Sequence, residues 1–309
     1  MLDVRRMRVL REVAVRGSFS SAAEALSFTQ SAVSQQIAAL EREAGTKLVQ
    51  RNARGIRLTE AGEALVRHTD AILARLSEAE AELEAIAGVR GGRLRLAAFE
   101  SASASLMPLA IAAFREQHPG VELSMIITEP EDAAPLLKSG ELDLALGYDS
   151  RVRTEADGIT RHQLLSDPMF VAMPADHPLV HKRTLRLADL ADDPWIGSVA
   201  DCECNRLVNR ACAVAGFEPR IAFQTDDYTA MQGFVAAGVG VCLIAELGLT
   251  SVRDDIVIRA LGRETPLRQI YAATATDAHR TPATQAMLEI LQGVAARYES
   301  RRPQLQLVG

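Results

Sequence analysis

The sequence predicts an α/β protein built from three consecutive parts. Short amphipathic helical patterns and a basic two-strand pattern occupy the first fifth of the 309 residues. A long proline-free stretch with heptad spacing follows, and alternating strand-like and helical patterns fill the last two-thirds. We therefore expect a small N-terminal domain over 1–58, a linker helix over 59–90 and an α/β domain over 91–309.

The composition is that of a globular protein rather than of one that coats nucleic acid. Hydrophobic residues make up 48% of the chain, charged residues 24%, and the formal net charge is −6. The charge is unevenly spread, since residues 1–67 hold 11 basic and 7 acidic side chains, whereas 68–89 hold one basic and five acidic. The basic surplus therefore lies in the N-terminal part, where a phosphate-binding surface would need it.

The N-terminal residues do not resemble a secretion signal. Residues 1–16 are rich in arginine and lack an apolar core followed by a small-residue cleavage site. No apolar run approaches the roughly 20 residues that span a bilayer. We expect a cytoplasmic protein whose four cysteines are reduced thiols.

Three short helices are expected at the N-terminus. Apolar side chains at helical spacing predict the first over 2–15, and Ser18 can cap a second over 21–26. A third is predicted over 30–44, with Thr29 as its N-cap. Its buried stripe would consist of Val33, Ile37 and Leu40.

The opposite face of the third helix is polar. Its side chains can donate and accept hydrogen bonds, as the reading of base edges in the major groove requires; they are Gln30, Ser31, Ser34 and Gln35. Two short helices joined by a tight turn, the second with a polar N-terminal face, form the helix-turn-helix pattern. The alternative is an ordinary solvated helix face, since Ser and Gln occur on any surface.

A basic hairpin is predicted directly after these helices. Residues 47–58 have the pattern of two strands around an Asn-Ala-Arg-Gly turn, and no acidic residue lies among their four cations: Lys47, Arg51, Arg54 and Arg57. A hairpin in this position is the wing of a winged helix-turn-helix. Its cations suit the phosphate backbone and the minor groove of DNA.

Four motifs occur one after another within about residues 2–65. They are an SF-x-x-AA-x-x-L helix, the segment TQSAVS, the segment LE-x-E-x-G-x-x-L and the exit R-L-T-x-A-G. Together they resemble the DNA-binding domain of LysR-type transcriptional regulators. The resemblance implies base contacts by the polar face of the third helix and phosphate and minor-groove contacts by Arg51 and Arg54, and Thr29 is also expected among the DNA-binding residues. Gln35 departs from the Arg often found in the family, which should alter base preference.

A heptad pattern runs through the linker. Its positions alternate four and three residues apart and include one polar residue; they are Leu65, Thr69, Ile72, Leu76, Ala79, Leu83 and Ile86. A single helix with so narrow a stripe would leave its apolar seam in water, so we expect it to pair with a second copy. Packing against the chain's own C-terminal domain is the alternative. A dimer would match a two-fold-related pair of DNA half-sites.

The C-terminal part alternates strand and helix patterns. Strands are predicted at Leu94–Phe99, Val121–Thr128, Leu142–Gly147, Met169–Met173, Val239–Ile244 and Ile270–Thr274, and helices at 104–117, 131–138, 203–215, 228–237 and 281–299. A weaker resemblance to the LysR family implies an effector domain of the periplasmic-binding-protein type. It would have two α/β subdomains, about 93–162 with 267–309 and about 163–266, and would bind its ligand between them.

Polar side chains that follow predicted strands indicate an effector site. In open α/β sheets, ligands bind beyond the carboxyl ends of strands, and a helix N-terminus suits a carboxylate or another acceptor. The expected site residues are Glu100, Ser101, Ser103, Thr128, Ser198 and Cys202. Plain helix capping is the alternative for each hydroxyl. Glu100, if it faces the cleft, would favour a ligand with a donor or a cationic group.

Three other patterns carry less weight. Gly238-Val239-Gly240 follows a helix and precedes a strand, the reverse of the order in a pyrophosphate loop. Cys202-Glu203-Cys204 is spaced more tightly than the cysteines of zinc sites, so we expect no metal or cofactor, with redox sensing as the alternative. Asp226-Asp227 suits a helix N-cap better than a paired-carboxylate site.

The sequence therefore predicts a LysR-type transcriptional regulator, not an enzyme, that responds to a small molecule. Its expected partners are double-stranded DNA, the effector and further copies of the chain in a dimer or tetramer, and RNA polymerase is a further candidate. Closure of the effector subdomains would change half-site spacing and DNA bending. A solute-binding protein is disfavoured by the wing. An enzyme is disfavoured because no nucleophile–base constellation is present.

Overall fold

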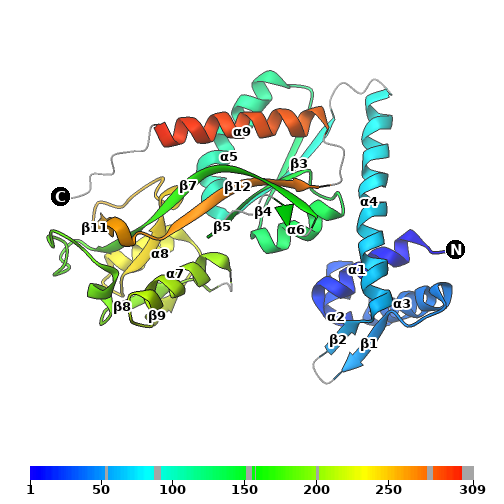
Figure 1. Cartoon of the computed structure of the whole chain (residues 1–309), viewed down its shortest axis with the longest axis horizontal. Coiled ribbons are helices and arrows are strands. Elements are labelled where there is room, and N and C mark those ends of the chain that lie inside the picture. The colour runs from blue at the N-terminus through cyan, green and yellow to red at the C-terminus, as the bar shows by residue number, and fades with distance from the viewer. Residues whose placement is uncertain are drawn as a thin grey trace. The chain divides into compact units, whose positions relative to one another are not determined.

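The computed structural model describes residues 1–52, 55–86, 92–150, 155–156, 158–199, 202–276 and 281–300. The chain forms two compact units, Met1–Glu82 with Lys138–Glu141, and Leu83–Leu137 with Leu142–Gly309. Figure 1 labels the elements of both units. The domain limits predicted from the sequence, 1–58, 59–90 and 91–309, remain predictions.

Three helices form the N-terminal part of the first unit. Local signals determine their ends: Ser18 and Thr29 accept hydrogen bonds from backbone N–H groups as N-caps, and Gly17 and Gly45 adopt left-handed conformations that end helices. The apolar stripes of all three meet in one core, which includes Leu10, Ala22 and the predicted stripe of the third helix. The bounds are α1 Val4–Arg16, α2 Phe19–Ala25 and α3 Gln30–Ala44.

An antiparallel hairpin follows, as predicted. Strand β1, Val49–Asn52, pairs with β2, Gly55–Leu58. Its exit is fixed by Thr59, whose hydroxyl donates to the carbonyl of Lys47 over 2.7 Å. Gly62 then passes so close to the hairpin that a Cβ atom there would lie 2.1 Å from the carbonyl oxygen of Leu48. The T-x-A-G motif therefore joins the hairpin to the next helix.

Helix α4, Glu60–Ile86, contains 27 residues and is about 40 Å long. Its heptad positions change character along its length. Leu65 is buried in the core of the first unit, and the hydroxyl of buried Thr69 donates to the carbonyl of Leu65 over 2.7 Å. Ile72, Leu76 and Leu83 are 39%, 48% and 65% exposed. The later part of the predicted seam is therefore open in the single chain.

The second unit is organised around one large curled sheet. Its strand order is β10 (Cys242–Ala245), β7 (Ile159–Pro174), β12 (Leu267–Ala275), β5 (Leu144–Asp149), β3 (Arg93–Ala98) and β4 (Glu122–Ile127). Strands β7 and β12 are long and antiparallel, and they run from one half of the unit into the other (Figure 1). We call the halves the β3 half and the β8 half. The β3 half contains β3 Arg93–Ala98, α5 Glu100–Gln117, β4 Glu122–Ile127, α6 Pro130–Lys138, β5 Leu144–Asp149, β6 Glu155–Ala156, β12 Leu267–Ala275 and α9 Pro282–Ser300.

Helices cover both faces of the sheet in the β3 half. Leu94 and Leu96 point into a core with α5 and α9, whereas Ala97 and Ala145 pack against α6. Strand β3 pairs in parallel with both β4 and β5, so its carboxyl end lies beside that of β4. This is the edge at which the sequence predicts ligand binding.

The β8 half is assembled on the far end of β7, Ile159–Pro174. Strands β10 and β11 pair antiparallel with that end, β8 pairs in parallel with β9, and Trp195 is fully buried in the core. The bounds are η1 Leu187–Leu190, β8 Pro194–Gly197, α7 Glu203–Val214, β9 Arg220–Gln224, α8 Tyr228–Ala236, β10 Cys242–Ala245, η2 Glu246–Gly248, β11 Ile256–Arg259 and η3 Gly262–Glu264.

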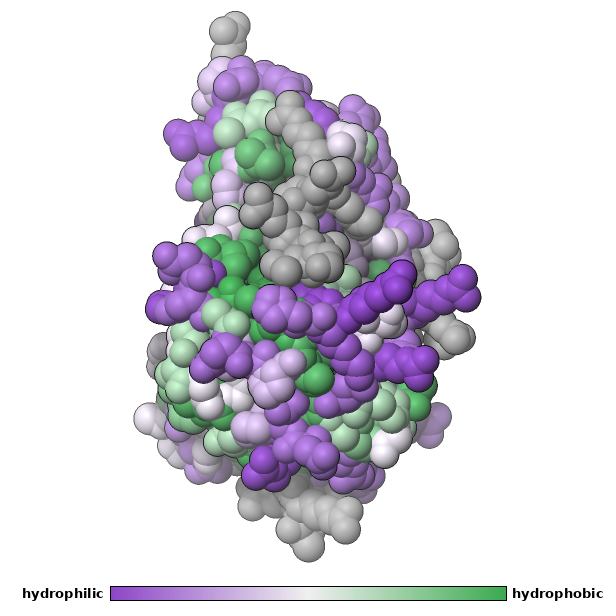
Figure 2. Space-filling view, turned by 90° about the vertical axis from the view of Figure 1, so that its left-hand side faces the viewer, coloured by the Kyte–Doolittle hydropathy of each residue, from purple (hydrophilic) through white to green (hydrophobic). Residues whose placement is uncertain are grey.

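The surface of the chain carries both hydrophilic and apolar residues. Figure 2, seen from the left-hand side of Figure 1, shows hydrophilic residues over much of this face, with apolar ones between them. Among the described helices, none combines the length and apolar character that crossing a membrane requires.

Candidate nucleic-acid interface and ligand cavity

The polar face of α3 is exposed over a buried stripe. Val33, Ile37 and Leu40 are at most 2% exposed, which fixes the rotation of the helix. The predicted reading residues lie on the outer side, where Gln30, Ser31 and Gln35 are exposed and Ser34 is half-buried. None of the four is taken into the core, so this face is free to meet a DNA groove.

Thr29 has a structural role at the start of this face. Its Oγ1 atom accepts a hydrogen bond from the backbone N–H of Ala32 over 3.2 Å and lies 3.0 Å from the hydroxyl of Ser31. The predicted N-cap is therefore confirmed. The cap holds the first turn of α3, from which Gln30 and Ser31 project.

The cations of the hairpin differ in their surroundings. Lys47 is 80% exposed, and its Nζ lies 2.7 Å from a carboxylate oxygen of Glu41. Burial of Glu41 would raise its pKa, but hydrogen bonds from Lys47 and from the backbone N–H groups of Leu48 and Val49 lower that pKa overall. Glu41 thus ties the hairpin to α3 and neutralises one predicted phosphate contact.

Three further cations complete the predicted basic set. Arg57 is exposed on β2. Arg51 lies on β1 opposite Ile56, but its side chain is outside the described part of the structure. Arg54 is outside the described residues altogether.

A cavity of about 160 Å³ lies in the second unit, at the edge where β3 ends. The β3 half contributes Phe99, Glu100, Ser101, Glu129 and Tyr148, and the β8 half contributes Trp195, Ser198, Cys202, Cys204, Asp226 and Tyr228, among others. Arg268, from the start of β12, completes the wall. Both halves therefore line one space, as the resemblance to the LysR family implies.

The structure brings together four of the six predicted effector residues. Glu100, Ser101, Ser198 and Cys202 line the cavity, and Ser103 and Thr128 are not among its lining residues. The hydroxyl of Ser103 instead donates to the carbonyls of Phe99 and Ala98, over 3.0 and 3.3 Å. Ser103 therefore has the local structural role that the capping alternative describes, because its hydroxyl is bonded to the backbone at the start of its own helix.

A buried ion pair in the cavity wall has no counterpart in the sequence-based prediction. Arg268 and Asp167 are 1% and 0% exposed, and two guanidinium nitrogens donate to one carboxylate oxygen over 3.0 and 2.5 Å. Burial by itself would lower the pKa of Arg268, but the charge of Asp167 holds it well above the ordinary value. The only sequence signal was an isolated arginine beginning an apolar strand, which is too common to single out.

Arg268 also contacts the first turn of α5. The hydroxyl of Ser101 accepts a hydrogen bond from Arg268 over 2.9 Å. The guanidinium also lies 4.9 Å from the ring centre of Tyr148 and 5.2 Å from that of Phe99. Ser101 is therefore part of the wall rather than a free hydroxyl at a helix N-terminus.

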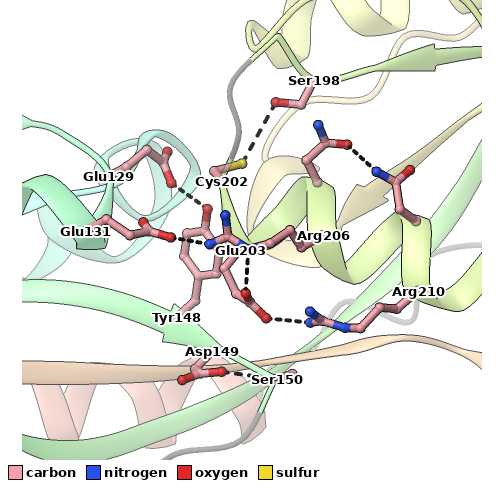
Figure 3. Close-up of polar contacts among 12 residues, drawn as sticks. Glu129, Glu131, Tyr148, Asp149, Ser150, Ser198, Cys202, Glu203, Arg206 and Arg210 are labelled. Atoms are coloured by element: carbon pink, nitrogen blue, oxygen red, sulfur yellow. Dashed lines mark hydrogen bonds and ion pairs between the residues drawn. The ribbon is translucent and has the colours of Figure 1, made fainter. Parts of the chain in front are cut away.

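Carboxylates reach the cavity from both halves. Glu129 accepts a hydrogen bond from the Tyr148 hydroxyl over 2.5 Å (Figure 3). Asp226 accepts one from the hydroxyl of Ser198 and another from the backbone N–H of Val199 over 3.0 Å. The prediction for the neighbouring aspartate is confirmed, because Asp227 caps α8 through the N–H groups of its first turn.

Two of the carboxylates that line the cavity, Glu100 and Glu129, have raised pKa values. Burial is the main cause for both, and the nearby charge of Asp227 adds to it for Glu100, as that of Glu131 does for Glu129. The hydrogen bond from Tyr148 acts in the opposite direction on Glu129. The cavity therefore concentrates negative charge in a partly desolvated space.

Cys202, Cys212 and Cys242 are buried, and Cys204 is partly buried. Burial raises the pKa of Cys204 and of Cys212 to about 11 in each case. Cys202 lies with its sulfur 3.9 Å from the Ser198 hydroxyl (Figure 3). Because a thiolate is the reactive form, the raised pKa of Cys204 disfavours a redox role for that thiol.

An ion-pair chain links the two halves beside the cavity. Arg206 on α7 lies 2.6 Å from Glu131 on α6 and 3.0 Å from Glu203, which also pairs with Arg210 (Figure 3). The charges of α7 thus reach across to the β3 half.

Comparisons with known proteins match both units. A family model described as "Bacterial regulatory helix-turn-helix protein, lysR family" matches residues 4–63, and one described as "LysR substrate binding domain" matches residues 87–296. The chain belongs to the LysR family. It is therefore a DNA-binding transcriptional regulator rather than an enzyme, with an effector-binding domain for a small molecule. The predicted family, fold class and function are confirmed.

Relatives and solved structures cover nearly the whole LysR-family chain. The RuBisCO operon transcriptional regulator of Allochromatium vinosum is 30% identical over 306 residues, 97% of this chain and 99% of that protein. A full-length OxyR variant from Pseudomonas aeruginosa matches with a TM-score of 0.63 at 20% identity, covering 94% of this chain and 98% of that one. Full-length CbnR complexed with its target DNA matches with a TM-score of 0.55 at 23% identity, covering 95% and 100%. These two structures share the fold.

Proposed function

We propose that this LysR-family regulator reads DNA with the first turns of α3 and binds its effector in the cavity between the β3 and β8 halves. The observation that carries the first part is the exposed face of Gln30, Ser31 and Gln35 above a fully buried stripe. These side chains match the donors and acceptors of base edges. Arg51 and Arg54 contact phosphates or the minor groove beside them, as the family resemblance implies.

The proposal extends to a dimer formed through α4. Ile72, Leu76 and Leu83 expose apolar surface at heptad spacing, which a second copy of the same helix would cover. A dimer sets two α3 helices at a fixed separation and so requires two half-sites in the DNA. Pairing of such dimers into a tetramer is part of the same proposal.

The effector would act by biasing the two halves of the second unit between arrangements. Glu100 and Ser101 lie on one side of the cavity, and Ser198 and Cys202 on the other, so a molecule bound there contacts both. Such a molecule shifts the equilibrium only by its differential affinity for the two arrangements. The change would alter DNA bending and, through it, the contact with RNA polymerase in the cytoplasm, where the DNA target lies.

A mobility-shift experiment with DNA from upstream of the protein's own gene tests this function. We expect retardation at a salt concentration at which unrelated DNA of the same length remains free, with affinity falling steeply as salt rises. Adding RNA polymerase should further retard the specific complex. Equal retardation of both DNAs at every salt concentration would contradict the proposal.

A further inference from the structure

The charges that line the effector cavity are unbalanced. Three carboxylates, those of Glu100, Glu129 and Asp226, line it together with one cation, Arg268. Within the described part of the chain, Glu129 and Asp226 accept hydrogen bonds from hydroxyl and backbone N–H donors, and Glu100 accepts one from the backbone N–H of Tyr228. None of the three takes part in a described ion pair. A cavity with this lining repels anions.

Arg268 offsets these charges only in part, since its charge lowers the pKa of Glu129 but its donors are already bonded within the wall. Its guanidinium is 1% exposed, and its hydrogen bonds go to Asp167 and to Ser101. The charge of Asp167, itself fully buried, already neutralises it. Among the described residues that line the cavity, an anionic effector would therefore find no free cation, although an arginine forms part of the wall.

The carboxylates are arranged on two sides. Glu100 begins α5 and Glu129 precedes α6, both in the β3 half, whereas Asp226 precedes α8 in the β8 half. A positively charged group between them would interact with both halves at once. The partial burial of Glu100 and Glu129 strengthens such an interaction relative to one at the surface.

We propose that the effector of this regulator is a small organic cation, carrying a protonated amine or amidine that binds between Glu129 and Asp226. This inference rests on the proposed function, in which this cavity is the effector site. The cavity volume of about 160 Å³ suits a compact molecule, since an engineered cavity of about 150 Å³ admits benzene. The matching ligand has about six non-hydrogen atoms.

Three probes of equal chain length separate charge from shape: 1,4-diaminobutane, the neutral 1,4-butanediol and the anionic succinate. We expect calorimetry on the full-length protein to detect the diamine at a concentration at which the diol and succinate do not bind. Glu129→Gln should weaken diamine binding at least about tenfold, as expected for loss of a charged partner. Glu116→Gln, which removes an exposed carboxylate from α5 outside the cavity, serves as the matched control.

A second variant, Glu100→Gln, should also weaken diamine binding and guards against misfolding of the first. Preferential binding of succinate, no binding of the diamine, or equal diamine binding by wild type and both cavity variants would overturn the proposal. Mobility shifts on the same samples distinguish a failure of the proposed ligand class from a failure of the proposed function. Specific DNA binding combined with any of these results means that the ligand class is wrong, whereas loss of specific DNA binding in the wild type contradicts the proposed function itself.

Discussion

Arg268 and Asp167 determine the character of the cavity wall at the scale of single residues. They face each other across β12 and β7, and each is almost completely buried. A buried charge that loses its partner keeps its desolvation penalty without the compensating attraction. The pair therefore acts as one structural unit at the point where the strands pass between the two halves.

Arg268→Ala should destabilise the protein by about 3–5 kcal/mol, because it leaves the Asp167 carboxylate buried without its cation. Chemical denaturation followed by circular dichroism measures the change. Arg253→Ala breaks an exposed ion pair with Asp255 and should leave the denaturation midpoint unchanged. Equal midpoints for both variants would mean that the buried pair is not structural.

Glu129 should make stability depend on pH. Burial raises its pKa in the folded state above the ordinary value of 4.5, so the folded state binds a proton more tightly than the unfolded chain. Its stabilising contribution is present below the unfolded pKa and is lost as pH rises through the folded pKa. The melting temperature of Glu129→Gln relative to wild type should therefore increase from about pH 4 towards neutrality. A difference that is constant with pH would contradict the raised pKa.

The sequence predicted this site only in part. Glu100, Ser101, Ser198 and Cys202 were found because they follow strands, and that position is visible in the pattern. Glu129 also follows a strand, but nothing in the pattern distinguishes its direction from that of its neighbour Thr128. Arg268 and Asp167 are about 100 residues apart, so their pairing depends on a strand register that no local signal encodes.

Helix ends are well determined at the scale of elements. The side chains of Ser18 and Thr29 cap helix N-termini, and Gly45 adopts the left-handed conformation that ends a helix. Because these effects depend only on the residue itself, α2 and α3 lie within two residues of their predicted bounds. Strand β7 is different, because its first half contains polar residues that β12 stabilises by pairing. Strand β9 is exposed throughout, so burial leaves no alternating pattern in its sequence.

Thr29→Ala should destabilise α3 by about 1 kcal/mol, since it removes the acceptor for the N–H of Ala32. Thermal unfolding of the full chain measures the loss. Thr29→Ser keeps the hydroxyl and should restore most of the stability. A Ser variant no more stable than the Ala variant would show that the cap is not the cause.

Leu76→Asp should convert the protein to monomers, because it introduces a charge into the exposed heptad seam of α4. Sedimentation analysis measures the assembly state, and operator affinity should fall in parallel. Ala71→Asp alters an exposed residue outside the heptad positions and should leave the assembly intact. If Leu76→Asp sediments as the wild type does, the seam is not the dimer interface.

At the scale of the whole molecule, two chemically different surfaces belong to one chain. The first unit carries a polar helix face beside a basic hairpin, and the second encloses an acidic cavity. The uneven charge along the sequence already predicted the first of these surfaces. The acidic cavity could not be predicted from the charge distribution along the sequence, because its carboxylates are far apart along the chain.

The central claim is that the outer face of α3 reads bases while the hairpin binds the DNA backbone. The most direct measurement is a salt-titrated mobility shift that compares Gln30→Ala with Arg54→Ala on specific and unrelated DNA. We predict that Gln30→Ala lowers the ratio of specific to nonspecific affinity about tenfold or more, whereas Arg54→Ala weakens both affinities alike and reduces the salt slope by about one. If both variants reduce specific and nonspecific binding equally, α3 does not read the sequence.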